Sequence, residues 1–134
     1  MASDRLWKDR DKKVVVLDSS AIMMLFEFSI DLEYELALLV GKFHIVLPKP
    51  IFDELKFLSE HGKGKKRRIA KPALELTKHY EILEAEGKGD DSVLFLAQKL
   101  DGVIVTNDRN LKQRAKEKCL KTIYLRSKKK LVLD

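Results

Sequence analysis

The sequence predicts an α/β fold, a three-layer α/β/α sandwich around a central parallel β-sheet. Short runs of apolar, β-branched residues alternate with longer segments of helical periodicity along the chain. The first run, VVVLD at residues 14–18, is continuously apolar up to its final acid, as expected for a strand buried on both faces. Strands that alternate with helices are typical of a parallel sheet with right-handed crossovers.

Length and composition favour a single globular domain over residues 1–134. The chain is 45% hydrophobic and 36% charged, and its single cysteine, Cys119, excludes an intramolecular disulfide. No run approaches the roughly 18 apolar residues of a membrane span, and the charged N-terminal segment is unlike a signal peptide. We therefore expect a cytoplasmic protein with no membrane partner.

The first third of the chain contains signals for two helices after the strand at 14–18. Residues 1–12 carry both charge signs and are expected to form a loose arm. Ser19 and Ser20 are expected to cap a helix over residues 21–28. Asp31 is expected to cap a second helix, which Gly41 ends.

The middle of the chain predicts a strand followed by two helices. FHIVL at residues 43–47 is the second expected strand. Pro48 and Pro50 open a helix after it, and the Gly-Lys segment at 62–65 breaks that helix. A basic helix is expected over residues 66–77.

The last part of the chain repeats the alternation of strands and helices. Gly87 and Gly89 mark a turn before a strongly apolar helix, and each later run of β-branched residues is short enough for a strand. The expected elements lie, in order, at residues 80–83, 90–100, 103–105, 107–118, 121–125 and 131–133.

Acidic residues occur where the expected strands end or the following helices begin. Asp18 ends the first strand, Asp108 directly follows the fourth, and Glu54 lies one turn into the helix after the second. Asp90 and Asp91 begin the helix that leads into the fourth strand. Because carboxyl ends of parallel strands share one sheet edge, we expect these carboxylates to lie close together.

Helical periodicity distinguishes neighbouring acids on the two helices. At about 100° per residue, Glu54 lies about 70° from the centre of the apolar stripe of its helix, and Asp53 lies about 170° from it. Asp90 lies about 50° from the apolar centre of its own helix, and Asp91 about 150°. Glu54 and Asp90 are therefore expected to point more toward the sheet.

A cluster of these carboxylates favours a divalent cation. Two carboxylates about 5 Å apart repel by roughly 3 kcal/mol at an effective dielectric constant near 20. Oxygen-only ligands select hard ions, Mg²⁺ or Mn²⁺, which can lower the pKa of a bound water. The alternative is that each acid is only a helix cap or a turn residue.

Four segments together resemble the PIN-domain family of ribonucleases. They are VVVLDSSAI at 14–22, PIFDEL at 50–55, GDDSVLFLA at 89–97 and VIVTND at 103–108. The resemblance implies a PIN-like fold and a Mg²⁺- or Mn²⁺-dependent endoribonuclease, in which a metal-activated water cleaves RNA to leave a 5′-phosphate. The DD pair at 90–91 and the RNLKQRAK run at 109–116 look closer to archaeal and rRNA-processing PIN nucleases than to bacterial VapC-type toxins.

The resemblance also implies a set of site residues. It carries the four acidic positions of the family onto Asp18, Glu54, Asp90 and Asp108, with Asp18, Asp90 and Asp108 as metal ligands. Asp91 also fits the third position if one loop residue is skipped, so the choice between Asp90 and Asp91 stays open. The expected supporting residues are small polar side chains beside the acids, namely Ser19, Thr106 and Asn107.

Basic residues favour RNA as the partner. The net charge is +6, from 27 basic and 21 acidic residues. The densest cluster is expected to contact RNA phosphates, and consists of Lys63, Lys65, Lys66, Arg67, Arg68 and Lys71. No aromatic residue lies between them, so base stacking is not indicated, and a merely solvated helix is the alternative. A second cluster near the C-terminus consists of Arg126, Lys128, Lys129 and Lys130.

The sequence leaves several partners and functions open. The RNA is expected to be rRNA or its precursor, and the apolar cluster Met23, Met24, Phe26 and Phe28 is either core or a face for a homodimer, an antitoxin or an assembly partner. A VapC-type toxin and a catalytically weak PIN module for RNA binding or ribosome assembly are alternative functions. A phospho-acceptor receiver domain is disfavoured, because only Asp18 follows the first strand.

Overall fold

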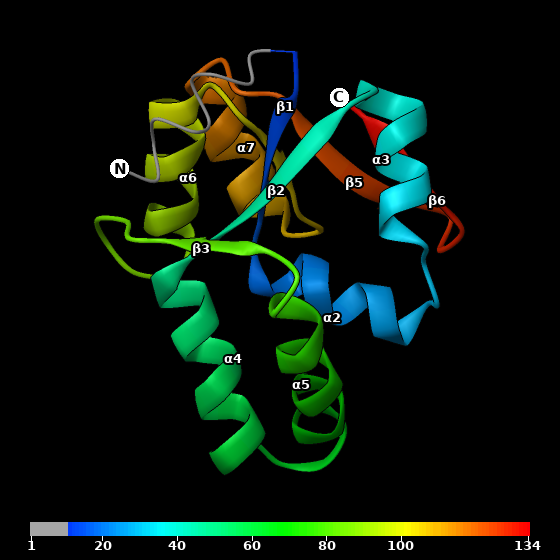
Figure 1. The fold of residues 1–134 in the computed structure, drawn as a ribbon, viewed down its shortest axis with the longest axis vertical. Coiled ribbons are helices and arrows are strands. Elements are labelled where there is room, and N and C mark those ends of the chain that lie inside the picture. Colours follow the sequence, from blue (N-terminus) through cyan, green and yellow to red (C-terminus); the bar gives the residue numbers. More distant parts are fainter. Residues whose placement is uncertain (1–10) are drawn as a thin grey trace.

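The computed structural model describes residues 11–134, which form one six-stranded sheet flanked by helices (Figure 1). The strand order is β3-β2-β1-β4-β5-β6, and every neighbouring pair is parallel except β5 and β6. The strands are β1 (Lys13–Leu17), β2 (Phe43–Pro48), β3 (Glu81–Leu83), β4 (Val103–Val105), β5 (Thr122–Arg126) and β6 (Lys130–Leu133). The predicted α/β/α sandwich is thus confirmed, with an antiparallel edge strand added.

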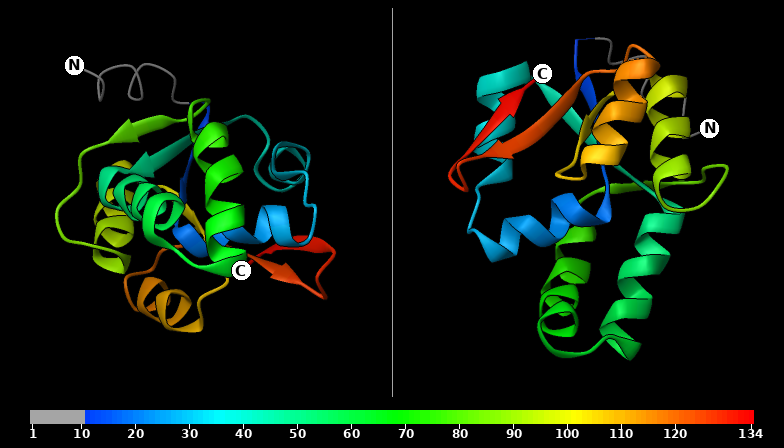
Figure 2. Two further views of the ribbon diagram at one scale, coloured as in Figure 1. Left: turned by 90° about the horizontal axis from the view of Figure 1, so that it is seen from below. Right: turned by 180° about the vertical axis from the view of Figure 1, so that it is seen from behind.

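The helices cover both faces and one edge of this sheet. They are α2 (Ser19–Glu27), α3 (Leu32–Val40), α4 (Lys49–His61), α5 (Gly64–Thr77), α6 (Asp90–Leu100) and α7 (Arg109–Glu117). Helices α6 and α7 lie on one face and α3 on the other, while α4 and α5 form a hairpin that projects beyond the sheet (Figures 1 and 2). Within the described residues, no helix has the length and apolar character that crossing a membrane requires.

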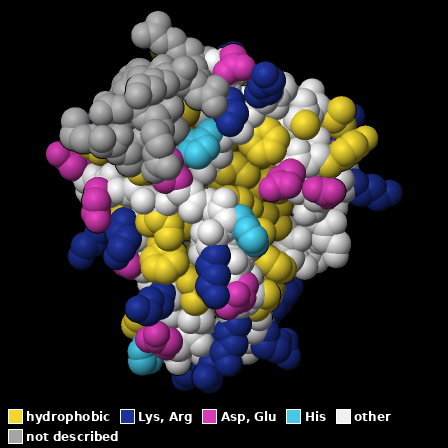
Figure 3. Space-filling view, in the orientation of Figure 1, with side chains coloured by type: hydrophobic (Ala, Val, Ile, Leu, Met, Phe, Trp, Pro, Cys, Tyr) yellow, Lys and Arg dark blue, Asp and Glu magenta, His cyan; other side chains and the backbone are white. Residues whose placement is uncertain are grey.

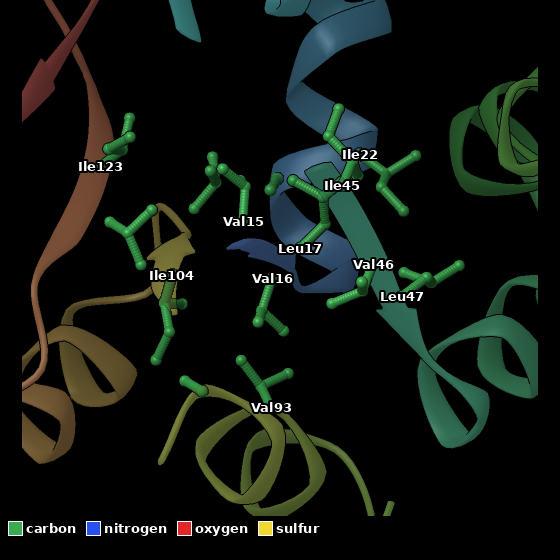
Figure 4. Close-up of a cluster of buried hydrophobic side chains, with 14 of the residues drawn as sticks. Val15, Val16, Leu17, Ile22, Ile45, Val46, Leu47, Val93, Ile104 and Ile123 are labelled. Atoms are coloured by element: carbon green, nitrogen blue, oxygen red, sulfur yellow. The ribbon is translucent and has the colours of Figure 1, made fainter. Parts of the chain in front are cut away.

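Strand β1 lies at the centre of the core. Val15, Val16 and Leu17 are each 0% exposed, which explains the continuous apolar run in the sequence. Alternate side chains point to opposite faces: Val16 points toward Val93 of α6, whereas Val15 and Leu17 lie on the side of α2 (Figure 4). Both faces of the sheet are therefore packed, and the end of β1 is held rigidly.

The position of β1 also defines where a site is expected. The chain proceeds from β1 to β2 and β3 on one side, then crosses to β4 on the other side. Open α/β sheets bind ligands at the carboxyl ends of the strands beside such a change of direction, which here are β1 and β4.

Two predicted helix starts are wrong, and both corrections involve acids. Asp18 caps α2, since its Oδ1 accepts a hydrogen bond of 2.7 Å from the Ala21 backbone N–H, whereas Ser19 and Ser20 lie inside the first turn. The last helix begins at Arg109 and not at Asn107, because the Asp108 carboxylate caps it. A carboxylate is a strong acceptor for the free N–H groups of a first turn, so it replaced the predicted serine caps. Asp31 caps α3 as predicted, with Tyr34 N–H 3.2 Å from its Oδ1.

The α4–α5 hairpin turns more tightly than the sequence suggested. Helix α4 continues to His61, and α5 begins at Gly64, so the break is shorter than the predicted residues 62–65. Gly62 N–H donates to the Leu58 carbonyl at 2.8 Å, and a Cβ on Gly62 would lie 2.4 Å from that oxygen. Glycine is therefore required for this close turn. The expected loose arm falls, for residues 1–10, outside the described part of the chain.

Candidate active site

Asp18 is the buried acid at the end of β1. Its side chain is 3% exposed and accepts hydrogen bonds from Ala21 N–H, from Ser20 Oγ at 2.8 Å and from Thr106 Oγ1 at 2.5 Å. Burial raises its pKa from 3.8 to about 6, against the lowering effect of these hydrogen bonds, and the nearby Asp90 raises it further. The fold therefore holds this carboxylate in place while disfavouring its charge.

Hydroxyl groups connect Asp18 to the end of β4. Ser20 Oγ lies 3.3 Å from Thr106 Oγ1, and it also accepts a hydrogen bond of 3.3 Å from the Asn107 backbone N–H. Thr106 is completely buried and accepts from the Asp108 backbone N–H at 3.0 Å. The segments after β1 and β4 are consequently joined by side-chain hydrogen bonds as well as by the sheet.

Asp108 and Asn107 lie in the short loop after β4. Asp108 Oδ1 accepts from the backbone N–H groups of Asn110 at 2.8 Å and Leu111 at 3.1 Å, so the side chain is fixed as the cap of α7. Its Oδ2 accepts no hydrogen bond from residues 11–134. Asn107 Oδ1 accepts from Leu125 N–H at 2.9 Å, which ties the loop to β5.

The two acids that begin α6 lie in different surroundings. Asp90 is half-buried, and its pKa is raised by burial and by the charge of Asp108, although Arg114 lowers it. Asp91 is exposed and forms an ion pair of 2.5 Å with Arg114 of α7. The structure thus groups Asp90 with Asp18 and Asp108 through their charges, and it pairs Asp91 with Arg114.

Glu54 faces the same region from the α4–α5 hairpin. It lines a pocket of about 430 Å³ together with Ser19, Ser20, Lys65 and other residues of α2, α4 and α5. Asp53, one residue earlier, instead forms an ion pair of 2.8 Å with Lys49 in its own helix. Both acids are exposed, but only Glu54 lines this pocket beside the first turn of α2.

The basic cluster of residues 63–71 occupies the start of α5. Side chains of Lys and Arg gather over the end of the hairpin (Figure 3). Lys65 forms an ion pair of 2.6 Å with Glu27 of α2, and Lys65 and Lys66 line the pocket that also contains Glu54. The described Lys and Arg residues of the cluster are all exposed, so positive charge lies beside the acids but is not buried with them.

The oxygen atoms in this region are suitable ligands for a hard cation. They are carboxylate and hydroxyl oxygens, and no ion pair compensates Asp18 or Asp108 within residues 11–134. As the side chains stand, no three Asp, Glu, His or Cys groups of the described residues are close enough to hold one ion together. Asp18, Asp90 and Asp108 instead form a sequence of neighbours, in which each adjacent pair interacts through its charge.

Two residues of the site were missed from the sequence. Ser20 was predicted only as a cap, yet its hydroxyl bonds directly to the Asp18 carboxylate, and the Asp-Ser-Ser spacing of a capping turn was the available signal. Arg114 had no local signal, because its partner Asp91 comes from another helix. Ser19, which was predicted as a supporting residue, lines the pocket, and its side chain forms no hydrogen bond to the acids within residues 11–134.

The apolar cluster at the end of α2 divides between core and surface. Met24 is 3% exposed and belongs to the core, whereas Phe26 is 37% exposed. Phe26 lines a separate pocket of about 340 Å³, together with Ile30, Leu76 and Tyr80 among others. Core packing thus explains only part of this cluster.

One family model and two relatives of known name match this chain over most of its length. A family model described as a PIN like domain matches residues 15–128. The chain is 29% identical to ribonuclease VapC9 of Archaeoglobus fulgidus, with 100% of this chain and 98% of that protein covered. It is 32% identical to ribonuclease VapC4 of Methanocaldococcus jannaschii, with 86% and 92% covered.

Solved structures agree on the fold. The PIN domain endonuclease Utp24 superposes with a TM-score of 0.76 at 22% identity, over 92% of both chains. VapBC-1 from nontypeable Haemophilus influenzae superposes with a TM-score of 0.57 at 16% identity, over 78% of this chain and 93% of that chain. Because the family model spans most of the chain, this protein belongs to the PIN-like domain family.

Proposed function

We propose that this protein is a divalent-metal-dependent endoribonuclease that hydrolyses RNA phosphodiester bonds. The observation that carries this proposal is the sequence of neighbouring acids Asp18, Asp90 and Asp108 beside the carboxyl ends of β1 and β4, with raised pKa values for Asp18 and Asp90. Carboxylates whose charge is disfavoured, first by burial and then by neighbouring acids, favour a cation. The likeness of this chain to proteins named ribonuclease and endonuclease supports RNA as substrate.

Each acid has a distinct proposed role. Asp18, Asp90 and Asp108 would hold Mg²⁺ or Mn²⁺, which when bound supplies a water of lowered pKa and offsets charge on the phosphate. Asp108 Oδ2 is available as a ligand, because capping of α7 uses only Oδ1. Glu54 orients water or substrate from the opposite side. Asp91 is left out of the metal site, since it is already paired with Arg114.

Neighbouring polar groups hold the acids in position and guide the substrate. Ser20 and Thr106 donate to Asp18, and Asn107 anchors the loop of Asp108 to β5. The cations of residues 63–71 bind RNA phosphates beside the pocket that Glu54 lines. These contacts position the strand and take no part in bond cleavage.

Cleavage of single-stranded and structured RNAs tests this function. With Mn²⁺ or Mg²⁺ we expect internal cleavage that leaves 5′-phosphate and 3′-hydroxyl ends, as enzymatic end-labelling would report. Addition of EDTA should abolish it. Cleavage that persists in EDTA, or products with 2′,3′-cyclic phosphates, would overturn the proposal.

A toxin controlled by a partner protein is the second candidate. Two relatives are named VapC ribonucleases, and similar solved structures are VapBC complexes. Expression of the wild-type chain should then arrest growth, while the Asp108→Asn variant should not. Normal growth on expression of active protein would favour RNA processing, for which rRNA is the predicted substrate. A homodimer remains a prediction, and the pocket beside Phe26 is its candidate face.

A further inference from the structure

The outer strands β5 and β6 have one face that helices cover only in part. Helix α3 lies against one face, where Leu131 N–H donates to Glu35 Oε1 at 3.0 Å. The opposite face carries Thr122, Tyr124 and Arg126, because alternate residues of a strand share a face. The register places Val132 beside Tyr124 and Lys130 beside Arg126 on this same face.

Lysines of α7 border this face. Lys112 Nζ lies 3.4 Å from the centroid of the Tyr124 ring, so the half-buried ring holds the ammonium group over the strands. Lys116 follows one helical turn later and lines a pocket of about 310 Å³ with Lys112, Lys121, Cys119 and other residues. Positive charge thus continues from the helix into the groove at the start of β5.

These cations lack acidic partners. Within residues 11–134, Lys112, Lys116 and Lys121 form no ion pair, whereas Lys65 of the hairpin cluster is paired with Glu27. Asp134 is the one acid among the residues that line the pocket. A groove with three unpaired lysines and one carboxylate favours an anionic occupant.

This surface is continuous with the candidate active site. Helix α7 begins at Arg109, directly after Asp108, and extends for about 13 Å toward the pocket. Arg126 and Lys130 lie where β5 ends, at the same edge of the sheet as the carboxyl end of β4. A strand that leaves the acids along α7 would therefore meet cations throughout its path.

We propose that this α7–β5 surface binds the phosphates of the RNA strand beyond the cleavage site, on the side away from the α4–α5 hairpin. The surface consists of Lys112, Lys116, Lys121, Arg126 and Lys130, and Tyr124 positions Lys112. The inference rests on the proposed function and adds a second half to the substrate path. The hairpin holds RNA on one side of the acids, and the α7–β5 surface holds it on the other.

Cys119 provides a direct test, because it is the only cysteine of the chain, is exposed and lines this pocket. The alkylation rate of its thiol is measured in EDTA, with and without single-stranded RNA of about 20 nucleotides. RNA at about ten times its Kd should slow alkylation about tenfold if bound RNA closes the pocket. Each protein is compared with itself, since loss of a nearby lysine also changes the reactivity of the thiol.

Matched variants complete the test. Lys112→Gln with Lys116→Gln should weaken the protection and reduce the log–log salt slope of RNA binding by about 1.4, or 0.7 for each lost contact. Lys78→Gln with Lys99→Gln removes the same charge elsewhere and should leave both unchanged. Thermal unfolding checks that each variant is folded.

The outcomes separate this inference from the proposed function. If the wild type cleaves RNA but RNA does not protect Cys119 from alkylation, the proposed role of the α7–β5 surface is wrong and the proposed nuclease function is retained. Equal slopes in the two double variants would also overturn it, and would leave a protein partner as the occupant. If the wild type neither binds nor cleaves RNA, both proposals fall.

Discussion

Asp18 and Glu54 are acids of the same candidate site, but the fold treats them in opposite ways. Asp18 is buried, caps α2 and receives hydrogen bonds from two hydroxyl groups. Glu54 is exposed on a projecting hairpin and has no hydrogen bond or ion pair within residues 11–134. The end of β1 thus holds the carboxylate of Asp18 in a place where its negative charge is unfavourable without a cation. The carboxylate of Glu54 on the hairpin is instead solvated by water.

The difference in burial suits the two regions to two different tasks. The charge of a buried carboxylate with a raised pKa is disfavoured until a cation binds, so Asp18 at the end of β1 suits metal binding. An exposed helix with acids and lysines suits contact with a substrate that arrives from solvent. Substitutions at the two regions should therefore affect different quantities.

The largest effect is expected for the acids at the sheet edge. Asp18→Asn or Asp108→Asn should lower kcat by about 10²- to 10³-fold, because loss of a ligand removes several kcal/mol of stabilisation. Asparagine keeps an oxygen that can still cap the helix, so circular dichroism should show an intact fold. Asp101→Asn, at an exposed position beyond α6, is the control and should retain full activity. Activity of the site variants close to that of this control would remove these acids from the mechanism.

A pH-dependent effect on stability should follow from the burial of Asp18. Its pKa is about 6 in the folded protein and 3.8 in the unfolded chain, so the folded state binds the proton more tightly. The contribution of Asp18 to the free energy of unfolding is therefore largest below pH 4, and it is lost as the pH rises to about 6. The loss is about 3 kcal/mol, which corresponds to a rise of the Asp18 pKa from 3.8 to about 6.

The measurement is the free energy of unfolding of wild type and Asp18→Asn from pH 4 to pH 7 in EDTA. The variant should gain about 3 kcal/mol relative to the wild type over this range, because asparagine does not titrate. A constant difference between the two proteins would show that burial does not disfavour the Asp18 charge.

A smaller effect is expected on the hairpin, where Glu54 and Asp53 form a matched pair. Glu54→Gln should lower kcat/KM by about tenfold to a hundredfold, as for a residue that orients groups at the metal. Asp53→Asn should leave kcat/KM unchanged and have little effect on stability, because its pair with Lys49 is exposed to solvent. Equal losses of activity at the two positions would contradict the different roles of these neighbours.

The smallest effect on chemistry is expected for the cations of α5. If all six cations of residues 63–71 touch phosphates, the log–log salt slope of single-strand binding is about −4, and partial contact halves it. The ion pair of Lys65 with Glu27 favours partial contact. Replacing Lys65, Lys66, Arg67 and Arg68 by Gln should flatten the slope and raise KM, with kcat preserved at saturating RNA. An unchanged slope would show that α5 is only a solvated helix.

Much of the fold could be predicted from the sequence. The helix 90–100 and the strand 103–105 have the predicted bounds, because apolar periodicity is strong there and glycines mark the turns. The rule that parallel strands bring their carboxyl ends together also predicted the neighbourhood of Asp18 and Asp108. The antiparallel direction of β6 could not be predicted, since it depends on a turn of residues 127–129 with no distinctive sequence signal.

The finer features of the site depend on tertiary contacts that periodicity does not encode. The ion pair between Asp91 and Arg114 joins two helices, so the choice between Asp90 and Asp91 could not be made from one helix alone. The Ser20 and Thr106 hydroxyls converge on Asp18 from segments far apart in the chain. Local spacing predicted serine caps instead, because it could not show that the acid itself was the better acceptor.

The central claim is that the acids at the end of β1 and β4 require a cation, and metal-dependent thermal stability tests it most directly. The melting temperature of the wild type should rise as Mn²⁺ is added, by the equivalent of about 2.7 kcal/mol at a hundred times the Kd, and EDTA should reverse it. In Asp18→Asn and Asp108→Asn the rise should be largely lost, whereas Asp101→Asn should match the wild type. An equal rise in all four proteins, or no rise in the wild type, would contradict the account.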